Sequence, residues 1–347
     1  MNFASDNTAP VHPKIMAALE AANSGHAMAY GNDAIAKRLD KHFADLFERP
    51  CAVFPVATGT AANSLSLAAM TPPWGAVYCH PDAHINTDEC GAPEFYTGGA
   101  KLVGVQGASG KINAQTLAAT LAAARHIGVH QVQPAAVSIT NATEAGTVYA
   151  VSEIAALAEI AHRADLKFHL DGARFANALV HQGATPADAT WRAGVDILSF
   201  GATKNGCMAA EAIVVFDEAL AATIALRRKR AGHLFSKMRY LAAQLEAYLA
   251  DDLWLVMARH ANALAQRLAQ ALAAVPGAKL AHTVEANEIF VELPEAAIVA
   301  LEQAGFAVYR WNGPGTQLLR LVVSWSSRLE DADRLAATAL AAASRIG

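Results

Sequence analysis

Short apolar runs alternate with helix-like stretches through roughly the first two thirds of this 347-residue chain. Such alternation predicts a mostly parallel sheet, because each helix carries the chain back across a face of the sheet before the next strand begins. Ligands bind such sheets beyond the carboxyl ends of the strands. Strands are expected at residues 51–56, 76–79, 102–105, 135–140, 167–170, 195–200 and 212–216, and helices at 59–70, 114–125 and 152–164. Ser152 is the expected N-cap of the last of these helices.

The pattern changes in the last third of the chain. Long helices are expected from about Glu218 to Leu272, followed by a shorter α/β unit and a final helix from Leu329. The chain is longer than one simple core usually supports. We therefore expect a large domain over residues 1–240, including an N-terminal segment that contacts substrate, and a small C-terminal domain over residues 241–347.

Charge and hydropathy exclude several classes of function. The net charge is −4 and no half of the chain is basic, which argues against a nucleic-acid partner. No apolar run reaches the roughly 18 residues that a membrane-spanning helix needs, and the first residues lack a signal-peptide pattern. The four cysteines form no CxxC pair, which argues against a disulfide framework or a metal site and indicates a reducing, cytoplasmic location.

Two motifs at strand ends carry the strongest chemical signal. The segment Phe168–Arg174 delivers Asp171 to the carboxyl end of an apolar strand, and Ser199–Gly206 delivers Lys204 into a glycine-rich loop. Pyridoxal 5′-phosphate (PLP) needs a lysine that forms a Schiff base and a carboxylate that pairs with its pyridinium nitrogen. Taken singly, Asp171 is equally consistent with a helix N-cap and Lys204 with a solvated loop lysine. Together, in this order, they indicate PLP chemistry.

Gly59, Thr60 and Ala61 lie between a predicted strand and a predicted helix. The first N–H groups of a helix point out of its N-terminus and bind anions there, assisted by the helix dipole. The position therefore fits a cradle for the cofactor phosphate, although the same residues also occur in strand-to-helix turns for geometric reasons.

The ordered set of motifs resembles that of the low-specificity L-threonine aldolases, PLP enzymes of fold type I in the β-eliminating-lyase group. The matching segments are Phe3–Asn7, Tyr30–Asp33, Gly59–Asn63, Ala83–His84, Asp88–Gly91, His169–Arg174, Lys204–Gly206 and Leu319–Val322. The resemblance implies an α/β fold with a mostly parallel seven-stranded sheet in the large domain and a smaller C-terminal α/β domain. It also implies a homotetramer with shared active sites that cleaves L-threonine, L-allo-threonine or phenylserine to glycine and an aldehyde.

The same resemblance implies roles for three polar residues. His84 resembles the histidine that stacks on the PLP ring and acts as a base, the alternative being a polar residue satisfied at a strand end. Asp88, one helical turn later, would orient that imidazole or bind the substrate hydroxyl, although many relatives have an aromatic residue there. His130 resembles a second active-site histidine near the β-hydroxyl, and His126 is an alternative match.

Four further residues match positions that bind anions. Arg174 and Arg320 resemble the pair that holds the substrate carboxylate, for which arginine offers a two-pronged geometry that lysine lacks. Ser5 resembles a serine that adds a hydrogen bond to the same carboxylate, the alternative being a residue of an N-terminal turn. Lys237 is the best match to a basic residue that reaches the phosphate in a neighbouring subunit.

One segment departs from the family pattern. Asn141–Gly146 stands where many relatives carry Thr-His-Asn before a glycine, so no role is transferred to Glu144. Two other functions stay open for this chain: a different fold type I PLP enzyme, such as a β-eliminating lyase or an aminotransferase, and a PLP-binding protein without turnover.

Overall fold

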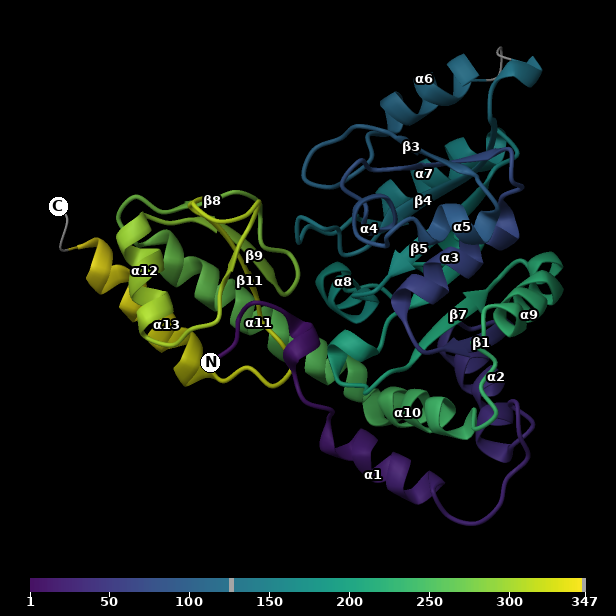
Figure 1. Ribbon diagram of the computed structural model, residues 1–347, viewed down its shortest axis with the longest axis horizontal. Coiled ribbons are helices and arrows are strands. Elements are labelled where there is room, and N and C mark those ends of the chain that lie inside the picture. Colours follow the sequence, from purple (N-terminus) through teal and green to yellow (C-terminus); the bar gives the residue numbers. More distant parts are fainter. Residues whose placement is uncertain (125–127, 345–347) are drawn as a thin grey trace.

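The computed structural model describes residues 1–124 and 128–344 and comprises two α/β units joined by a long helix (Figure 1). The larger unit contains a seven-stranded sheet with the order β1-β7-β6-β5-β4-β2-β3. Its strands are β1 (Ala52–Val56), β2 (Gly75–Cys79), β3 (Lys101–Gly104), β4 (Gln133–Thr140), β5 (Lys167–Gly172), β6 (Ile197–Phe200) and β7 (Glu211–Val215). The pairs from β3 through β6 are parallel, and β7 is antiparallel to both β6 and β1. The predicted mostly parallel sheet is confirmed.

Helices cover both faces of this sheet. One face packs against α3 (Gly59–Met70), α4 (His84–Thr87), α5 (Ala92–Thr97) and α9 (Ala221–Arg230). The other packs against α2 (Ala34–Leu46), α6 (Ala114–Ala124), α7 (Val151–Arg163), α8 (Phe175–Gln182) and α10 (Arg239–Leu249). Because both faces are covered, strands such as β2 and β6 are buried along their whole length.

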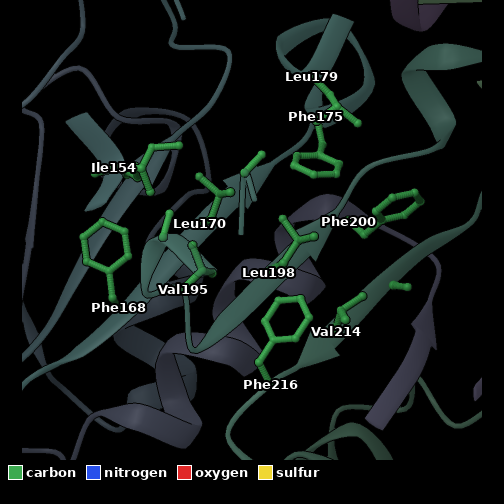
Figure 2. Packing of buried hydrophobic residues seen from close by; sticks show 14 of the residues in the cluster. Ile154, Phe168, Leu170, Phe175, Leu179, Val195, Leu198, Phe200, Val214 and Phe216 are labelled. Atoms are coloured by element: carbon green, nitrogen blue, oxygen red, sulfur yellow. The ribbon is translucent and has the colours of Figure 1, made fainter. Parts of the chain in front are cut away.

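Aromatic side chains fill the core next to the strand ends. The Phe200 ring lies 5.2 Å from Phe43 and 5.6 Å from Trp254, between centroids. Figure 2 shows Phe175, Phe200 and Phe216 packed over the β5–β7 region. Rings of this size bury large apolar areas, so this cluster fixes the strand ends that deliver the polar residues described below.

The smaller unit contains a four-stranded antiparallel sheet with the order β10-β11-β9-β8. Its strands are β8 (Lys279–Leu280), β9 (Glu288–Glu292), β10 (Tyr309–Arg310) and β11 (Leu318–Val322), and its helices are α12 (Glu295–Gln303) and α13 (Leu329–Ala343). The first residues of the chain pack in this smaller unit. Phe3 is buried in its core, and Val322 N donates to Phe3 O at 2.7 Å. The short helix η1 (Asp6–Thr8) then leads toward the larger unit, before α1 (Pro13–Ala22).

The helix α11 (Leu253–Ala273) belongs to both cores. Its residues up to Ala258 pack in the core of the larger unit, whereas those from Ala261 onward pack in the smaller one. The predicted boundary at residue 240 stays a prediction. The helix α10 packs on the larger unit, and the change from one core to the other takes place further along the chain, inside α11.

One local prediction is wrong. Ser152 does not cap α7: the cap is Ala150, whose N–H donates to the Glu153 carboxylate at 2.7 Å. The long helices expected between Glu218 and Leu272 are α9, α10 and α11. The chain turns between α9 and α10, where Gly232 has φ +78°, and again at Asp251 and Asp252 before α11. No helix within the described ranges is both long enough and apolar enough to cross a membrane.

Candidate active site

Four polar segments converge at the carboxyl edge of the parallel strands. The loop after β2 leads to His84, the loop after β4 carries Glu144, Asp171 is the penultimate residue of β5, and the loop after β6 carries Lys204. The carboxyl ends of adjacent parallel strands lie side by side, which is why residues far apart in sequence meet here.

Asp171 is buried, with 2 % of its surface exposed. Its Oδ2 accepts a hydrogen bond from Asn63 Nδ2 at 2.8 Å, and its Oδ1 accepts one from Ala173 N at 3.0 Å. The alternative interpretation of Asp171 as a helix N-cap is wrong, because Arg174 occupies that position in α8. Both oxygens are thus held by donors, and the carboxylate is fixed at the strand end.

A hydrogen-bonded chain connects Asp171 to His84. Asn63 Nδ2 also donates to Glu89 Oε1 at 2.9 Å, and the same Glu89 oxygen lies 2.8 Å from His84 Nδ1. The Glu89 side chain is fully buried. Asn63 and Glu89 were not predicted as site residues, although both stand inside motifs that match the family.

The contacts of His84 determine its electrostatics. The hydrogen bond from its ring to Glu89 raises the pKa of His84, and burial opposes this effect less strongly. With Nδ1 directed at a carboxylate, the proton of the neutral ring belongs on Nδ1, and Nε2 keeps its lone pair. The Asp88 Oδ2 lies 3.8 Å from Nε2 on the exposed side, as the one-turn spacing predicted. The arrangement is that of a base with its second nitrogen oriented by an acid.

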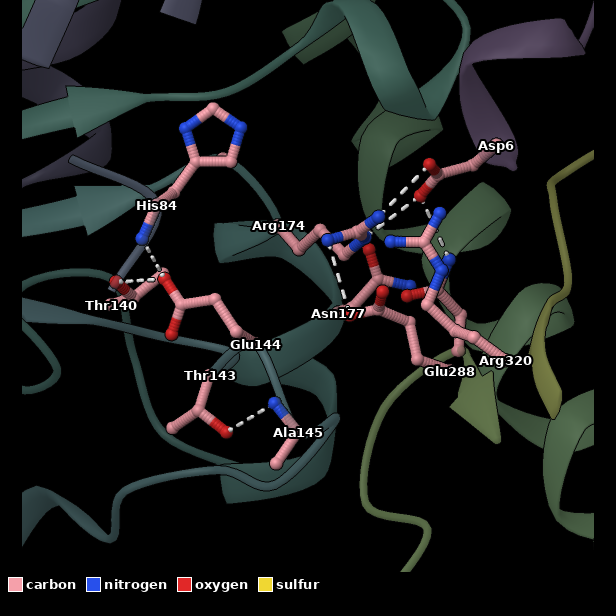
Figure 3. Close-up of polar contacts among 12 residues, drawn as sticks. Asp6, His84, Thr140, Thr143, Glu144, Ala145, Arg174, Asn177, Glu288 and Arg320 are labelled. Carbon is pink, nitrogen blue, oxygen red and sulfur yellow. Dashed lines mark hydrogen bonds and ion pairs between the residues drawn. The ribbon is translucent and has the colours of Figure 1, made fainter. Parts of the chain in front are cut away.

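Glu144, in the loop that departs from the family pattern, lies next to the backbone of His84 (Figure 3). Its Oε1 accepts from the backbone N of His84 at 2.8 Å and from Thr140 Oγ1 at 2.7 Å, and its buried Oε2 has no hydrogen-bond partner within the described residues. Burial raises the pKa of Glu144 to about 7. Glu144 therefore anchors the backbone that carries His84.

The two neighbours of Lys204 are anchored to the protein core. In the short helix η4 (Thr203–Asn205), Asn205 Nδ2 donates to Tyr248 OH at 2.8 Å, and Thr203 Oγ1 donates to Ala210 O at 3.3 Å. Just before η4, the backbone N of Ala202 donates to the buried Glu211 carboxylate at 2.7 Å. Lys204 thus sits between fixed residues in the loop after β6.

Arg174 forms the centre of a buried ionic cluster. Its Nε and Nη2 donate to the Asp6 carboxylate at 2.8 and 3.0 Å, and its Nη1 lies 3.1 Å from Glu288 Oε2. Burial opposes ionisation of Asp6, but the charge and hydrogen bonds of Arg174 outweigh it and lower the pKa of Asp6. Neither Asp6 nor Glu288 was predicted as part of the site. Asp6 stands in a matching motif, whereas Glu288 carried no signal in the sequence.

Arg320 approaches the same cluster from β11 (Figure 3). Its guanidinium lies over the rings of Tyr309 and Trp311, 5.2 and 5.1 Å from their centroids, and its Nη2 donates to Ala4 O at 3.2 Å. Ser5 precedes η1, and its Oγ accepts from Asn7 N at 3.2 Å. The structure thus brings Arg174 and Arg320 together, whereas Ser5 is engaged in the turn that was its alternative interpretation.

Gly59 and Thr60 begin α3, and Thr58 caps the helix by accepting from Ala61 N at 3.1 Å. The first helical hydrogen bond is made by Ala62 N to Thr58 O, so the N–H groups of Gly59 and Thr60 precede it and remain directed outward. A side chain added at Gly59 would meet no atom within 4 Å, so the space over this helix end is open. This geometry suits an anion.

Two predicted residues lie apart from this cluster. His130 is exposed in the short helix η2 (Gly128–His130), which precedes β4 and therefore lies at the amino edge of the sheet. The alternative match His126 lies outside the described residues. Lys237 is exposed on the connection between α9 and α10. The same connection approaches the start of α3, where Ala57 N donates to His233 Nδ1 at 3.3 Å. Within residues 1–124 and 128–344, no three acidic, histidine or cysteine side chains form a group that could hold a metal.

Comparison with known proteins identifies the family. A sequence model described as beta-eliminating lyase matches residues 2–296. The chain belongs to this family. It is 44% identical to a low specificity L-threonine aldolase of Pseudomonas aeruginosa over 96% of this chain and 95% of that one, and 42% identical to one of a Pseudomonas species over 96% of each chain. The structure of a Leishmania major threonine aldolase superposes with a TM-score of 0.91 at 30% identity, covering 97% of this chain and 98% of the other. The predicted family and fold class are confirmed.

Proposed function

We propose that this chain is a PLP-dependent carbon–carbon lyase that cleaves β-hydroxy-α-amino acids such as L-threonine and L-allo-threonine to glycine and an aldehyde. The observation that carries the proposal is the connected chain from Asp171 through Asn63 and Glu89 to His84, at the strand ends that also deliver Lys204. The two Pseudomonas relatives, matched over nearly their full length, support the same activity.

The residues present fit PLP. Asp171 is a buried carboxylate held at both oxygens, which suits a partner for a protonated ring nitrogen, and the open end of α3 at Gly59 and Thr60 suits a phosphate. Lys204, between two anchored neighbours, would supply the amine that holds the aldehyde group. The chemistry that bound PLP supplies is an acceptor for the electron pair left at Cα when a bond to Cα breaks.

The other side chains would orient the substrate and move a proton. Arg174 and Arg320 would take the substrate carboxylate, which sets the direction of the Cα–Cβ bond. His84 Nε2 would remove the proton of the β-hydroxyl, since Nδ1 is occupied by Glu89. Asp88, next to Nε2, would bind that hydroxyl or orient the ring.

The remaining predicted residues would act between subunits of a homotetramer. His130 is exposed at the amino edge of the sheet, so it would contribute to a site only in a neighbouring subunit. Lys237 would likewise reach a neighbour's phosphate. An apolar groove of about 1150 Å³ between α1 and α10, lined by Val11, Met16, Met208 and Phe235 among others, supports an interface on this side. Sedimentation analysis tests the assembly.

Product analysis tests the proposed reaction against its alternatives. The holoenzyme is given L-threonine, L-allo-threonine and phenylserine separately, and all products are quantified. Glycine and the matching aldehyde are expected. Pyruvate or another keto acid with ammonia would instead indicate β-elimination, and amino transfer to a keto acid an aminotransferase. Binding of PLP without any product would indicate a non-catalytic protein.

A further inference from the structure

The region that would hold the substrate carboxylate already contains two carboxyl groups of the protein. Asp6 occupies Nε and Nη2 of Arg174, and Glu288 Oε2 faces the third nitrogen, Nη1, at 3.1 Å. Each guanidinium nitrogen of Arg174 therefore faces a carboxylate in this structure (Figure 3). Each Nη of a guanidinium carries two N–H groups. A substrate carboxylate that approaches Nη1 of Arg174 therefore comes next to the Glu288 carboxyl group, which already lies 3.1 Å from that nitrogen.

The two carboxyl groups are held unequally. Asp6 accepts two hydrogen bonds from Arg174 and a third from Asn287 Nδ2 at 3.1 Å, and its pKa is lowered despite burial. Glu288 lies near Arg174 without a hydrogen bond to its Oε2, although the residue is only 2 % exposed. Burial raises the pKa of Glu288. Glu288 is therefore the carboxyl group that gives way more easily.

The charged groups around Glu288 come from four elements. Arg174 at the start of α8, Arg320 on β11 and Lys204 in the loop after β6 favour its ionised form, and Asp6 in η1 opposes it. The balance depends on pH. Below its pKa Glu288 is neutral and does not compete for Arg174, and above its pKa it is charged and does.

We propose that Glu288 is an internal competitor for the substrate carboxylate and thereby sets how strongly the site binds amino acids. In the free enzyme it occupies Nη1 of Arg174, and on binding it gives up this contact by taking a proton from solvent or by turning aside. Amino-acid affinity then falls as pH rises through the range in which Glu288 ionises. This inference rests on the proposed function only for the role of Arg174 as a carboxylate ligand.

Glycine titration of the holoenzyme, followed by the absorbance of the bound cofactor, tests the proposal without turnover. The variants are Glu288→Gln and Glu288→Met, both neutral and similar in length, so that one remains if the other fails to fold. Glu292→Gln is the matched control, because Glu292 is exposed on the same strand. Each protein is titrated with glycine over a pH series that starts at pH 8.5 and runs downward, and circular dichroism verifies its fold at each pH.

Both Glu288 variants are expected to bind glycine at least threefold more tightly than the wild type at pH 8.5. The difference should shrink as the pH is lowered and Glu288 becomes protonated, and Glu292→Gln should match the wild type at every pH. In turnover the same change appears as a lower KM with little change in kcat. Unchanged or weaker glycine binding by folded Glu288 variants at pH 8.5 overturns the proposal. If the wild type binds glycine yet releases no aldehyde from any substrate, the proposed function is wrong. The glycine titrations of the Glu288 variants still test whether Glu288 competes with a bound carboxylate.

Discussion

The Nδ1 atom of His84 lies 2.8 Å from Oε1 of the buried Glu89, and this contact is the main reason that the pKa of His84 is raised. It directs the ring so that Nε2 is the nitrogen available for proton transfer. The same Glu89 oxygen is tied through Asn63 to Asp171, so the proposed base and the proposed partner of the cofactor ring are held by one amide group.

Replacing Glu89 by Gln should change the pH dependence of catalysis. A base acts in its neutral form, so the acid limb of the kcat/KM profile reports its pKa. Loss of the carboxylate lowers the pKa of His84, and the limb should move to lower pH while the rate falls about tenfold or more. Asp88→Asn is the comparison, because Asp88 is exposed and 3.8 Å from the other nitrogen, and it should shift the limb less. An equal or larger shift in Asp88→Asn would contradict this account.

Replacing Asn63 by Leu should weaken both stability and PLP retention. The change leaves the buried carboxylates of Glu89 and Asp171 without their shared donor, which costs about 1–3 kcal/mol for each group left unsatisfied. Ser66→Ala in the same buried helix is the control, since Ser66 Oγ has no partner among the described residues and its loss should cost little. Thermal unfolding and equilibrium dialysis of PLP measure the two effects. Wild-type retention of PLP by Asn63→Leu would refute the bridging role.

Replacing Arg174 by Ala should destabilise the fold as well as impair substrate binding. Asp6 and Glu288 are both 2 % exposed, and removing the partner of buried charges costs about 3–5 kcal/mol. Arg267→Ala breaks an exposed pair with Asp333 and should cost only about 0–1 kcal/mol. Urea denaturation of the two variants measures the difference. Equal losses would mean that the ionic cluster does not stabilise the chain.

Replacing Glu144 by Gln should flatten the dependence of stability on pH. The folded-state pKa of Glu144 is about 7, above its usual 4.5, so wild-type stability is lost as pH rises from about 4.5 through 7, by at most about 3 kcal/mol. The amide keeps an oxygen for His84 N and Thr140 without becoming charged. Thermal unfolding between pH 5 and 8 should therefore separate Glu144→Gln from the wild type at the high end only, and Glu20→Gln on exposed α1 is the control. Parallel curves for wild type and Glu144→Gln would count against a buried titration.

The sequence predicted the sheet because a strand buried on both faces is mostly apolar along its length, and β2 and, apart from Ser199, β6 have that pattern. It predicted Asp171 and Lys204 from the motifs at two strand ends, and His84 from the resemblance to the family. Their partners depend on tertiary contacts instead. Asn63 and Asp171 are 108 residues apart, and Asp6 and Arg174 are 168 apart, so no local pattern pairs them. Glu288 stands inside a core strand of the smaller unit, where a charged residue is explained only once Arg174 lies opposite.

The N-cap of α7 shows that local sequence rules do not fix the exact residue at which a helix begins. Ser152 has a good capping side chain, but the helix begins at Val151, and Glu153 supplies the hydrogen bond to Ala150 N that helps to fix this start. Several side chains near the start of a helix can cap it, and tertiary packing decides which of them does so. The exact first residue of a helix therefore depends on packing.

Product stoichiometry from L-threonine tests the proposed cleavage reaction and the role of Lys204 in one experiment. Purified wild type, Lys204→Ala and the exposed-lysine control Lys279→Ala are each incubated with PLP and substrate, and glycine and acetaldehyde are quantified together. We expect equal amounts of the two products from the wild type and from Lys279→Ala, in which an exposed lysine is replaced, and none above background from Lys204→Ala. Near-normal cleavage by Lys204→Ala, or a keto acid and ammonia in place of glycine and acetaldehyde, would contradict this expectation.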